Sequence, residues 1–251
     1  MADFLMLVIV DKTENTYSFL QFNRDTMTEV ALIDHNGEGE ATANIQLCTA
    51  HWYGGNREQS CENTVKSVKK LLGGIQIDGY YELNMSEIPK LNSMVDGVTV
   101  TLEDDFSKKY PKMKKGATIN LDDEQAYAYV HDRYGVGDEE NTSRMKRQQQ
   151  YMTGFFKKLQ EKVKANPNYA NEVFESLQDV STTDIAIGKI SNISNIFASG
   201  TDKGIFELAG KSKIGQALGD EMDHMEFYVN KKAMVSTMSE LFGIVEQKNK
   251  E

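Results

Sequence analysis

The sequence lacks any apolar stretch long enough to cross a membrane as a helix. Its longest apolar run near the start covers residues 4–10, whereas a membrane-spanning helix needs about 20 apolar residues. Met1 leads almost directly into this run, without the pattern of a signal peptide. We therefore expect the chain as given to be soluble. Its compartment stays open, because an anchor or a leader could lie upstream.

The chain also has fewer basic residues than acidic ones. The 28 lysine and arginine residues stand against 38 acidic residues, which gives a formal net charge of −10. This excess of negative charge disfavours nonspecific binding to nucleic acid or to anionic membrane surfaces. A protein with such a field would bind an anion through a local basic cluster or a metal ion, so the search for a functional site narrows to the places where arginines gather.

Cysteine and histidine are rare as well. The chain has only Cys48 and Cys61 with four histidines, and it shows no Cys-x-x-Cys or Cys/His spacing typical of zinc proteins. We therefore expect no zinc site. Two free thiols are the expectation for a cytosolic protein and a short-loop disulfide that for an exported one, and the spacing does not distinguish them.

The alternation of predicted strands and helices indicates a layered α/β fold. A length of 251 residues suits one such domain or two small ones. No low-complexity linker and no internal repeat divides the chain, so a single domain over residues 1–251 is the expectation.

The first 25 residues predict a β-hairpin. Residues 3–11 form a continuous apolar run typical of a fully buried strand. The turn-like residues 12–15 follow, and residues 16–22 predict the partner strand. The hairpin ends at Arg24 and Asp25. A charged pair at such a point is, by default, a salt bridge at a turn.

Three helices are predicted from caps and periodicity. One begins near Ser60 and ends at the glycine pair 73–74. A second covers residues 122–132, where Asp122 and Gln125 form a capping pair. A longer helix begins near Thr142, has a wide apolar stripe and stops before Pro167. Later segments predict short strands, a small helical region and a closing helix.

Arginines gather on either side of an acidic, glycine-containing loop. Arg133 ends one predicted helix, and Arg144 and Arg147 lie in the first turns of the next. The start of a helix offers free backbone N–H groups and partial positive charge, and a guanidinium matches phosphate oxygens two at a time. The alternative is a solvated ion-pair network. Its acidic members would be Asp138, Glu139 and Glu140.

Carboxylates lie at the ends of both hairpin strands. Asp3 begins the first strand and Asp25 follows the second. Mg²⁺ in proteins is commonly bound by one or two carboxylates together with phosphate oxygens, so this pair is a candidate metal site. Both residues could equally be strand-end caps.

Together these motifs resemble the LytR–CpsA–Psr family. Residues 3–26, with an aspartate-bearing strand and a second strand that ends in Arg-Asp-Thr, are similar to the opening of the family core. Residues 119–159 resemble its second signature, a Leu-x-x-x-x-Ala-x-x-Tyr-Val helix, an arginine, an acidic glycine-containing loop and an Arg-x-x-Arg-Gln-Gln helix start. Residues 224–230 are similar to a strand near the family's C-terminus. The resemblance covers nearly the whole chain.

The resemblance implies a fold and an activity. The fold would be an α-β-α sandwich with a central mixed sheet and an apolar tunnel for lipid. Family members are extracytoplasmic, membrane-anchored phosphotransferases of mainly Gram-positive bacteria. They move an anionic glycopolymer such as teichoic acid or capsule from a polyprenyl-pyrophosphate carrier to peptidoglycan, and no nucleic acid is involved. The alternative is a non-catalytic module that binds polyprenyl phosphates or cell-wall polymer.

The resemblance also implies residue roles. Mg²⁺ would be the cofactor, held by Asp3 and Asp25, and Asp25 would also orient or deprotonate the attacking hydroxyl. An exported location favours a disulfide between Cys48 and Cys61. The family's preceding strand and membrane anchor are not found before Asp3, and a histidine stands where the family usually has an arginine. The phosphate-binding residues would be Arg24, Arg133, Arg144, Arg147, Gln148 and His131.

Overall fold

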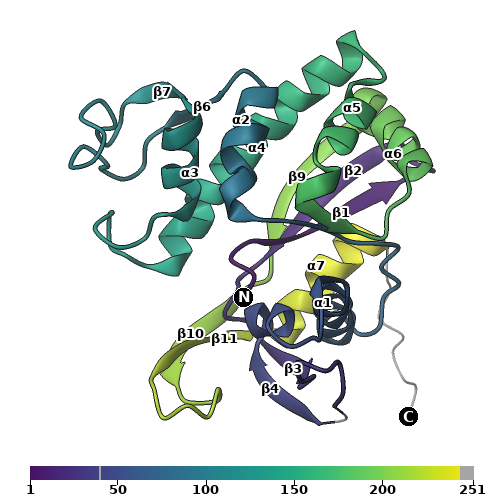
Figure 1. Cartoon of the computed structure of the whole chain (residues 1–251), viewed down its shortest axis with the longest axis vertical. Coiled ribbons are helices and arrows are strands. Elements are labelled where there is room, and N and C mark those ends of the chain that lie inside the picture. The colour runs from purple at the N-terminus through teal and green to yellow at the C-terminus, as the bar shows by residue number, and fades with distance from the viewer. Residues whose placement is uncertain (40, 244–251) are drawn as a thin grey trace.

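A three-stranded mixed sheet lies at the centre of the computed structural model, which describes residues 1–39 and 41–243 (Figure 1). Strand β2 (Thr16–Phe22) lies between β1 (Leu5–Asp11) and β9 (Thr201–Glu207). It pairs antiparallel with β1 and parallel with β9. The turn between β1 and β2 includes Asn15, whose φ of 49° suits asparagine better than most residues. The predicted hairpin is therefore confirmed.

One face of this sheet packs against α4 (Asn141–Ala165) and α6 (Ile187–Ser199). The ring of Phe19 in β2 stacks on Phe156 of α4 at a centroid distance of 4.2 Å. Further along the same face, the ring of Tyr17 meets that of Phe197 in α6 at 4.9 Å. Because side chains alternate along a strand, the intervening residues of β2 point to the opposite face.

The opposite face packs against α1 (Arg57–Leu71) and α7 (Lys231–Phe242). Leu20 of β2 is fully buried there with Val68 of α1 and Met238 of α7. Helices thus cover both faces of a mixed sheet, and the predicted α/β fold, an α-β-α sandwich, is confirmed.

The prediction that the first strand is fully buried is wrong. No residue of β1 is buried, and Val8 is 51% exposed. Within the described residues β1 pairs only with β2, so it is an edge strand. Leu5, Leu7 and Ile9 pack against the core shared with α1 and α7, while the opposite face of the strand is open. A continuous apolar run does not by itself separate a central strand from an edge strand.

The helices near the arginine cluster follow local sequence signals. Helix α3 (Asp123–His131) begins with a capping box formed by Asp122 and Gln125, as predicted. Helix α4 begins at Asn141 and ends at Ala165, just before Pro167. Its side chains Tyr151 and Phe155 enter a second core with β6 (Val98–Thr101), β7 (Thr118–Leu121), α2 (Ile88–Met94) and α3. Phe156 stacks on Phe19 of β2, so α4 joins this second core to the central sheet.

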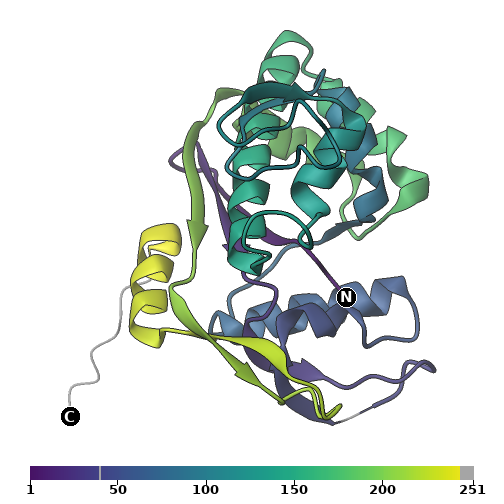
Figure 2. The same cartoon turned by 90° about the vertical axis from the view of Figure 1, so that its left-hand side faces the viewer.

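The remaining elements surround this framework (Figures 1 and 2). Four antiparallel two-stranded ladders pair β3 with β4, β5 with β8, β6 with β7 and β10 with β11. No helix among the described residues combines the length and apolarity that crossing a membrane requires. The bounds are β3 (Met27–Ala31), β4 (Thr42–Gln46), η1 (Leu47–His51), β5 (Tyr81–Leu83), η2 (Met85–Glu87), α2 (Ile88–Met94), β6 (Val98–Thr101), β7 (Thr118–Leu121), α5 (Tyr169–Ser176), η3 (Gln178–Val180), β8 (Ser181–Thr183), β10 (Gly210–Gly215) and β11 (His224–Val229).

Candidate functional site

The segment that follows β2 is fixed by backbone hydrogen bonds from two other elements. The amide of Cys48 in η1 donates to the carbonyl of Arg24 at 2.9 Å, and the amide of Phe227 in β11 donates to the carbonyl of Asp25 at 2.8 Å. The Asn23 side chain accepts a hydrogen bond from the Asp25 amide at 2.9 Å. The end of the hairpin is thus held in one conformation, which positions both charged side chains.

Three distant segments bring their charges together at this point. Arg24 forms an ion pair with Asp3, and its Nε lies 3.7 Å from Oδ1 of Asp25. From the first turn of α4, Nη1 of Arg144 approaches Oδ1 of Asp3 to 3.6 Å. Asn141, also in that turn, donates to Oδ2 of Asp25 at 3.2 Å. Figures 1 and 2 place the N-terminus between α1 and the helical region around α4. Asp3, two residues from this terminus, contacts both arginines.

Arg144 is the most unusual cation of this cluster. Its residue is 6% exposed, it donates to Oδ1 of Asn141 at 2.8 Å, and its Nε has no hydrogen-bond partner among the described residues. Burial lowers the pKa of Arg144, and the nearby guanidinium groups of Arg24 and Arg133 lower it further, against the opposing effect of Asp3. A buried cation with a free donor is a favourable place for an anion.

Asp25 is the acidic counterpart of Arg144 in this cluster. Burial raises the pKa of its carboxyl group, although the positive charges of Arg24, Arg144 and Arg133 act to lower it. Asp25 is thus a half-desolvated carboxyl surrounded by cations and held by Asn141. A group in this state is suited either to accept a proton or to bind a cation.

Arg24 and Arg133 complete the positive side. Burial by itself would lower the pKa of Arg24, but the neighbouring Cys48, Asp3 and Asp25 raise it overall. Arg133 lies at the end of α3, half-buried, with its guanidinium over the ring of Tyr134 at 4.6 Å. Its charge acts on both Arg144 and Asp25. The structure therefore brings Arg24 and Arg144 together with both predicted carboxylates and places Arg133 near enough for its charge to act on Arg144 and Asp25.

Arg147 and Gln148 take part in the internal hydrogen bonding of the fold instead. Arg147 is 1% exposed, and it donates to the carbonyls of Tyr129 and Asp132 and to Oδ2 of Asp104 at 2.5 Å. Gln148 donates to the carbonyl of Val130 at 3.1 Å. Both residues tie α4 to the end of α3, which places Arg133.

His131 is also engaged locally. Its ring stacks on Tyr127 at 4.7 Å, and its Nδ1 lies 3.2 Å from Oδ1 of Asp132. No contact in the described chain joins it to Arg24, Arg144 or Asp25. Its predicted part in phosphate binding stays a prediction.

The alternative ion-pair network of the acidic loop is not formed. Asp138 accepts hydrogen bonds from the Glu140 amide and from Ser143 at 2.8 Å, and Glu139 accepts one from the Gly135 amide. Within residues 1–39 and 41–243, none of the three loop acids forms an ion pair with an arginine. Asp138 and Glu139 hold the loop through these hydrogen bonds, and Asp138 joins it to Ser143 in the first turn of α4.

The structure contradicts the predicted disulfide. Cys48 and Cys61 are both free and buried. The sulfur of Cys48 in η1 lies 3.5 Å from Nη2 of Arg24, whereas that of Cys61 in α1 lies 3.8 Å from Nε2 of His51. The two thiols thus face different neighbours. Burial raises the pKa of the Cys61 thiol to about 12, with Glu82 adding to the effect.

Sequence reasoning missed Asn23, Cys48 and Asn141 as members of the cluster. Asn23 directly precedes the charged pair, and Asn141 lies one helical turn before Arg144, so proximity to known site residues was the available signal. Phe155 and Phe156, on the apolar stripe of α4, pack in the protein interior, Phe155 in the second core and Phe156 between that core and Phe19 of β2.

Comparison with known proteins gives a family and a fold. The model of the LytR_cpsA_psr family matches residues 1–242. The polyisoprenyl-teichoic acid–peptidoglycan teichoic acid transferase TagU of Bacillus cereus (strain AH820) is 29% identical over 157 residues, which are 62% of this chain and 46% of TagU. The match therefore spans about half the length of that relative.

Two solved structures have the same fold. Protein gbs0355 from Streptococcus agalactiae superposes with a TM-score of 0.74 at 21% identity, over 96% of this chain and 78% of that one. TagT bound to LI-WTA superposes with a TM-score of 0.68 at 20% identity, over 95% and 83% of the two chains. At these identities the likeness establishes the fold alone.

Proposed function

The chain belongs to the LytR–CpsA–Psr family, and from this premise we propose that it is a phosphotransferase of cell-wall assembly. It would move an anionic glycopolymer from a polyprenyl-pyrophosphate carrier to peptidoglycan, in the cell envelope and beside the membrane that holds the carrier. The related TagU is by its name a teichoic acid transferase that acts on peptidoglycan. The observation that carries the proposal is the convergence of Arg24, Arg133 and Arg144 with two carboxylates.

The arginines would neutralise the pyrophosphate. Phosphoryl transfer depends mainly on positioning and on stabilisation of developing charge. The Nε of buried Arg144, which has no partner among the described residues, can donate to a phosphate oxygen. This hydrogen bond would offset the free-energy cost of burying an unpaired donor and a charge. Arg24 would bind from the hairpin side and Arg133 from the end of α3. The acidic exterior makes this local cluster necessary, because the whole chain repels an anion.

Asp25 would act on the acceptor. The hydroxyl oxygen of the acceptor forms a new bond to the polymer-linked phosphorus as the bond to the polyprenyl phosphate breaks. The hydroxyl proton passes to the Asp25 carboxylate, whose raised pKa favours its acceptance. The hydrogen bond from Asn141 holds the carboxylate in place during this transfer.

Asp3 and Asp25 fit the donor chemistry of Mg²⁺. Both offer carboxylate oxygens next to the same guanidinium, that of Arg24, and Mg²⁺ commonly takes one or two carboxylates with phosphate oxygens and water. When bound, the ion would offset negative charge on the pyrophosphate. Asp3 would then be shared between the metal and the two arginines that it contacts here.

Binding without turnover is the second candidate function. Two of the predicted phosphate-binding residues, Arg147 and Gln148, are engaged within the fold, and His131 pairs with Asp132. Fewer cations would therefore face a bound phosphate than the family resemblance implies. A module with this reduced cluster could bind a polyprenyl phosphate and not transfer it.

One experiment separates these functions. The purified chain is incubated with a polyprenyl pyrophosphate, with and without Mg²⁺, and both phosphate release and complex formation are measured. We expect Mg²⁺-dependent turnover that is lost in Arg24→Ala and Arg144→Ala and is weakened in Arg144→Lys, which keeps the charge but not the planar fork. Lys70→Ala, which removes an exposed cation paired with Glu29, serves as the control.

Each result has one meaning. Turnover that is lost in the two arginine variants and kept in the control supports the transferase. Tight binding without turnover supports the binding module. Absence of any binding contradicts both functions for this site.

A further inference from the structure

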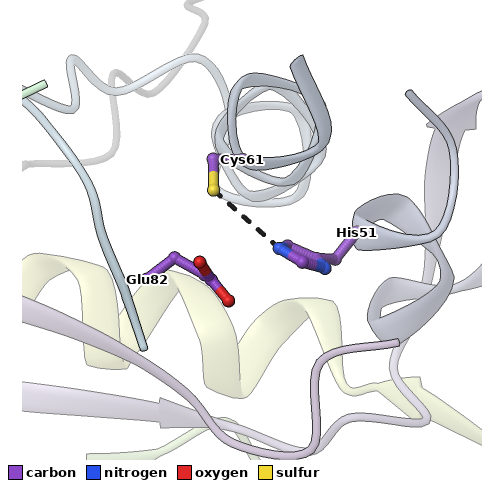
Figure 3. A group of neighbouring side chains, drawn as sticks. All are labelled: His51, Cys61 and Glu82. Carbon is purple, nitrogen blue, oxygen red and sulfur yellow. Dashed lines mark hydrogen bonds between the residues drawn. The ribbon is translucent and has the colours of Figure 1, made fainter. Parts of the chain in front are cut away.

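A second group of chemically reactive side chains lies apart from the arginine cluster, and the proposed function does not use it. His51 at the end of η1, Cys61 on α1 and Glu82 in β5 point toward a common space from three different elements (Figure 3). Nε2 of His51 lies 3.8 Å from Sγ of Cys61. One ligand atom from each of the three residues lies within 4.8 Å of the other two.

We infer, against the expectation drawn from cysteine and histidine spacing, that these residues form a binding site for a thiophilic divalent cation, Zn²⁺ by its chemistry. Thiolate sulfur, imidazole nitrogen and carboxylate oxygen are the zinc ligands of proteins, and three of them with a water molecule make a four-coordinate site. Mg²⁺ does not select thiolate, so this site differs in metal preference from the one at Asp3 and Asp25.

The distances support this assignment. Bonds of about 2.3 Å to sulfur and 2.0 Å to nitrogen, at a tetrahedral angle, separate the two ligand atoms by about 3.6 Å. The observed 3.8 Å between Sγ of Cys61 and Nε2 of His51 is close to this value. Every pair among the three ligand atoms lies within 4.8 Å, so side-chain movements of about 1 Å would bring all three to one ion.

Burial and charge also suit a cation. Cys61 is 3% exposed, whereas the Glu82 side chain is 18% exposed and His51 is half-buried. The site is therefore anchored by a buried thiol and stays open to a metal ion from solvent. A thiolate and a carboxylate together match the charge of a divalent ion. Arg57 forms an ion pair with Glu82 and can hold that carboxylate as an outer partner of the metal.

A nucleophilic cysteine is a poorer explanation of the same group. Reactive cysteines lie in electropositive surroundings that favour the thiolate. Around Cys61 the acidic groups Glu82, Glu58 and Asp184 act against the single cation Arg57. An acidic environment favours a bound cation, and a bound cation would in turn stabilise the thiolate of Cys61.

A bound ion would add a link between three elements that are already joined by the Arg57–Glu82 ion pair and by the hydrogen bond from Asn63 to the carbonyl of Ala50. It would tie the end of η1 to α1 and β5, where the sequence had suggested a disulfide from Cys61 to Cys48. Because η1 also carries Cys48, which contacts Arg24, the ion would stiffen one wall of the arginine cluster.

The test uses the full chain without a polyhistidine tag. After treatment with a chelator, the protein is titrated with Zn²⁺ alone, and with Co²⁺ for its absorption spectrum. We expect one equivalent of either metal per chain, a thiolate-to-cobalt charge-transfer band with tetrahedral Co²⁺ bands, and a higher thermal midpoint with Zn²⁺. Excess Mg²⁺ should not displace the bound metal.

Variants identify the ligands. Cys61→Ser and His51→Gln should weaken Zn²⁺ binding by more than the roughly 10- to 100-fold that loss of an outer partner causes, and Glu82→Gln should weaken it as well. Cys48→Ser and His224→Gln, which alter the other thiol and a histidine paired with Asp220, are the matched controls. Circular dichroism checks that each variant is folded.

Three outcomes would overturn the inference. The first is no stoichiometric binding of either metal by the folded parent protein. The second is binding that persists in folded Cys61→Ser. The third is a loss of Zn²⁺ affinity in Cys48→Ser equal to that in Cys61→Ser, which would mean that the metal does not select Cys61. None of these outcomes depends on transferase activity, so failure here leaves the proposed function untouched.

Discussion

At the scale of single residues, the charged pair Arg24–Asp25 has a simple and a functional interpretation. Arg24 does form an ion pair, but with Asp3, and its contact to Asp25 is looser at 3.7 Å. A salt bridge at a turn would explain these contacts alone. It does not explain why Arg144 is buried beside them with an Nε that has no hydrogen-bond partner among the described residues. A second cation kept in a desolvated position is the arrangement that an anion-binding site requires.

Asp25→Asn is expected to separate activity from stability. Removal of the proton acceptor should reduce turnover by roughly 100-fold or more. The same substitution should leave the free energy of unfolding at neutral pH unchanged or higher, because burial disfavours the charge of this carboxyl group. Steady-state rates and urea unfolding measure the two effects. Unchanged turnover would remove Asp25 from the mechanism.

The pH dependence of that stability difference follows from the direction of the pKa shift. Since the pKa of Asp25 is raised on folding, its contribution to stability is complete below the ordinary aspartate pKa and is lost as pH rises through the folded value. The free energy of unfolding of Asp25→Asn, minus that of the parent, should therefore increase with pH over this window and then level off. Urea unfolding at a series of pH values tests this. A difference that falls with pH would contradict the assignment.

At the scale of elements, the first two turns of α4 have two roles. Asn141 and Arg144 reach the charge cluster, whereas Arg147 and Gln148 bond to the last carbonyls of α3. A helix presents residues three apart on neighbouring faces, so one helix start both contributes to the site and holds its neighbour. The Arg-x-x-Arg-Gln-Gln motif therefore combines a residue of the charge cluster, Arg144, with residues that bond within the fold, Arg147 and Gln148.

Arg147→Ala is expected to act on stability. It would leave Asp104 without its buried partner and two carbonyls of α3 without donors, at a cost of about 3–5 kcal/mol. Chemical unfolding of this variant and of Arg144→Ala provides the comparison. Arg144→Ala should cost less, because its partners are fewer and its charge is poorly solvated. Equal costs would contradict the different roles of the two arginines.

The edge position of β1 gives another prediction. Val8→Thr should change the free energy of unfolding by less than about 0.5 kcal/mol, because the side chain is already half in water. Val30→Thr in β3 is the matched change at a fully buried site and should cost more than about 1 kcal/mol, since it buries a hydroxyl group. A large cost at Val8 would mean that another segment covers this face.

At the scale of the whole molecule, a net charge of −10 opposes the anion that the cluster is proposed to bind. The net charge repels an anionic ligand at long range, whereas the arginines attract it only once it is close to the cluster. The local cluster lies where the N-terminal segment, the hairpin end and α4 meet, so its field is confined to one place on an acidic protein.

Association of a soluble prenyl pyrophosphate should therefore become faster with salt at low ionic strength. Raising the salt from about 0.01 M to 0.15 M shortens the Debye length from about 30 Å to about 8 Å, which screens the global repulsion more than the short contacts. Stopped-flow measurement of the association rate tests this. A rate that falls with salt would show that the cluster, and not the net charge, governs approach.

The sequence by itself determined the local elements and much of the site. The hairpin, the capping box of α3, the extent of α4 and the glycines that follow α1 depend on residues within a few positions of one another, where propensity and capping act. The start of α1 was predicted too late in the chain, near Ser60, whereas Asn56 caps the helix, which begins at Arg57. Arg24, Asp25 and Arg144 were identified from motifs whose order is visible in the chain.

Only the tertiary structure decided which side chains meet. Packing of the elements made β1 an edge strand and paired buried Arg147 with Asp104. It also kept Cys48 and Cys61 apart and placed Glu82 beside His51 and Cys61. Such contacts join residues tens of positions apart, and no local spacing reports them. The physical reason is that a side chain's partner, burial and electrostatic environment are set by the packing of whole elements against one another, whereas the elements themselves are set by their neighbours in the chain.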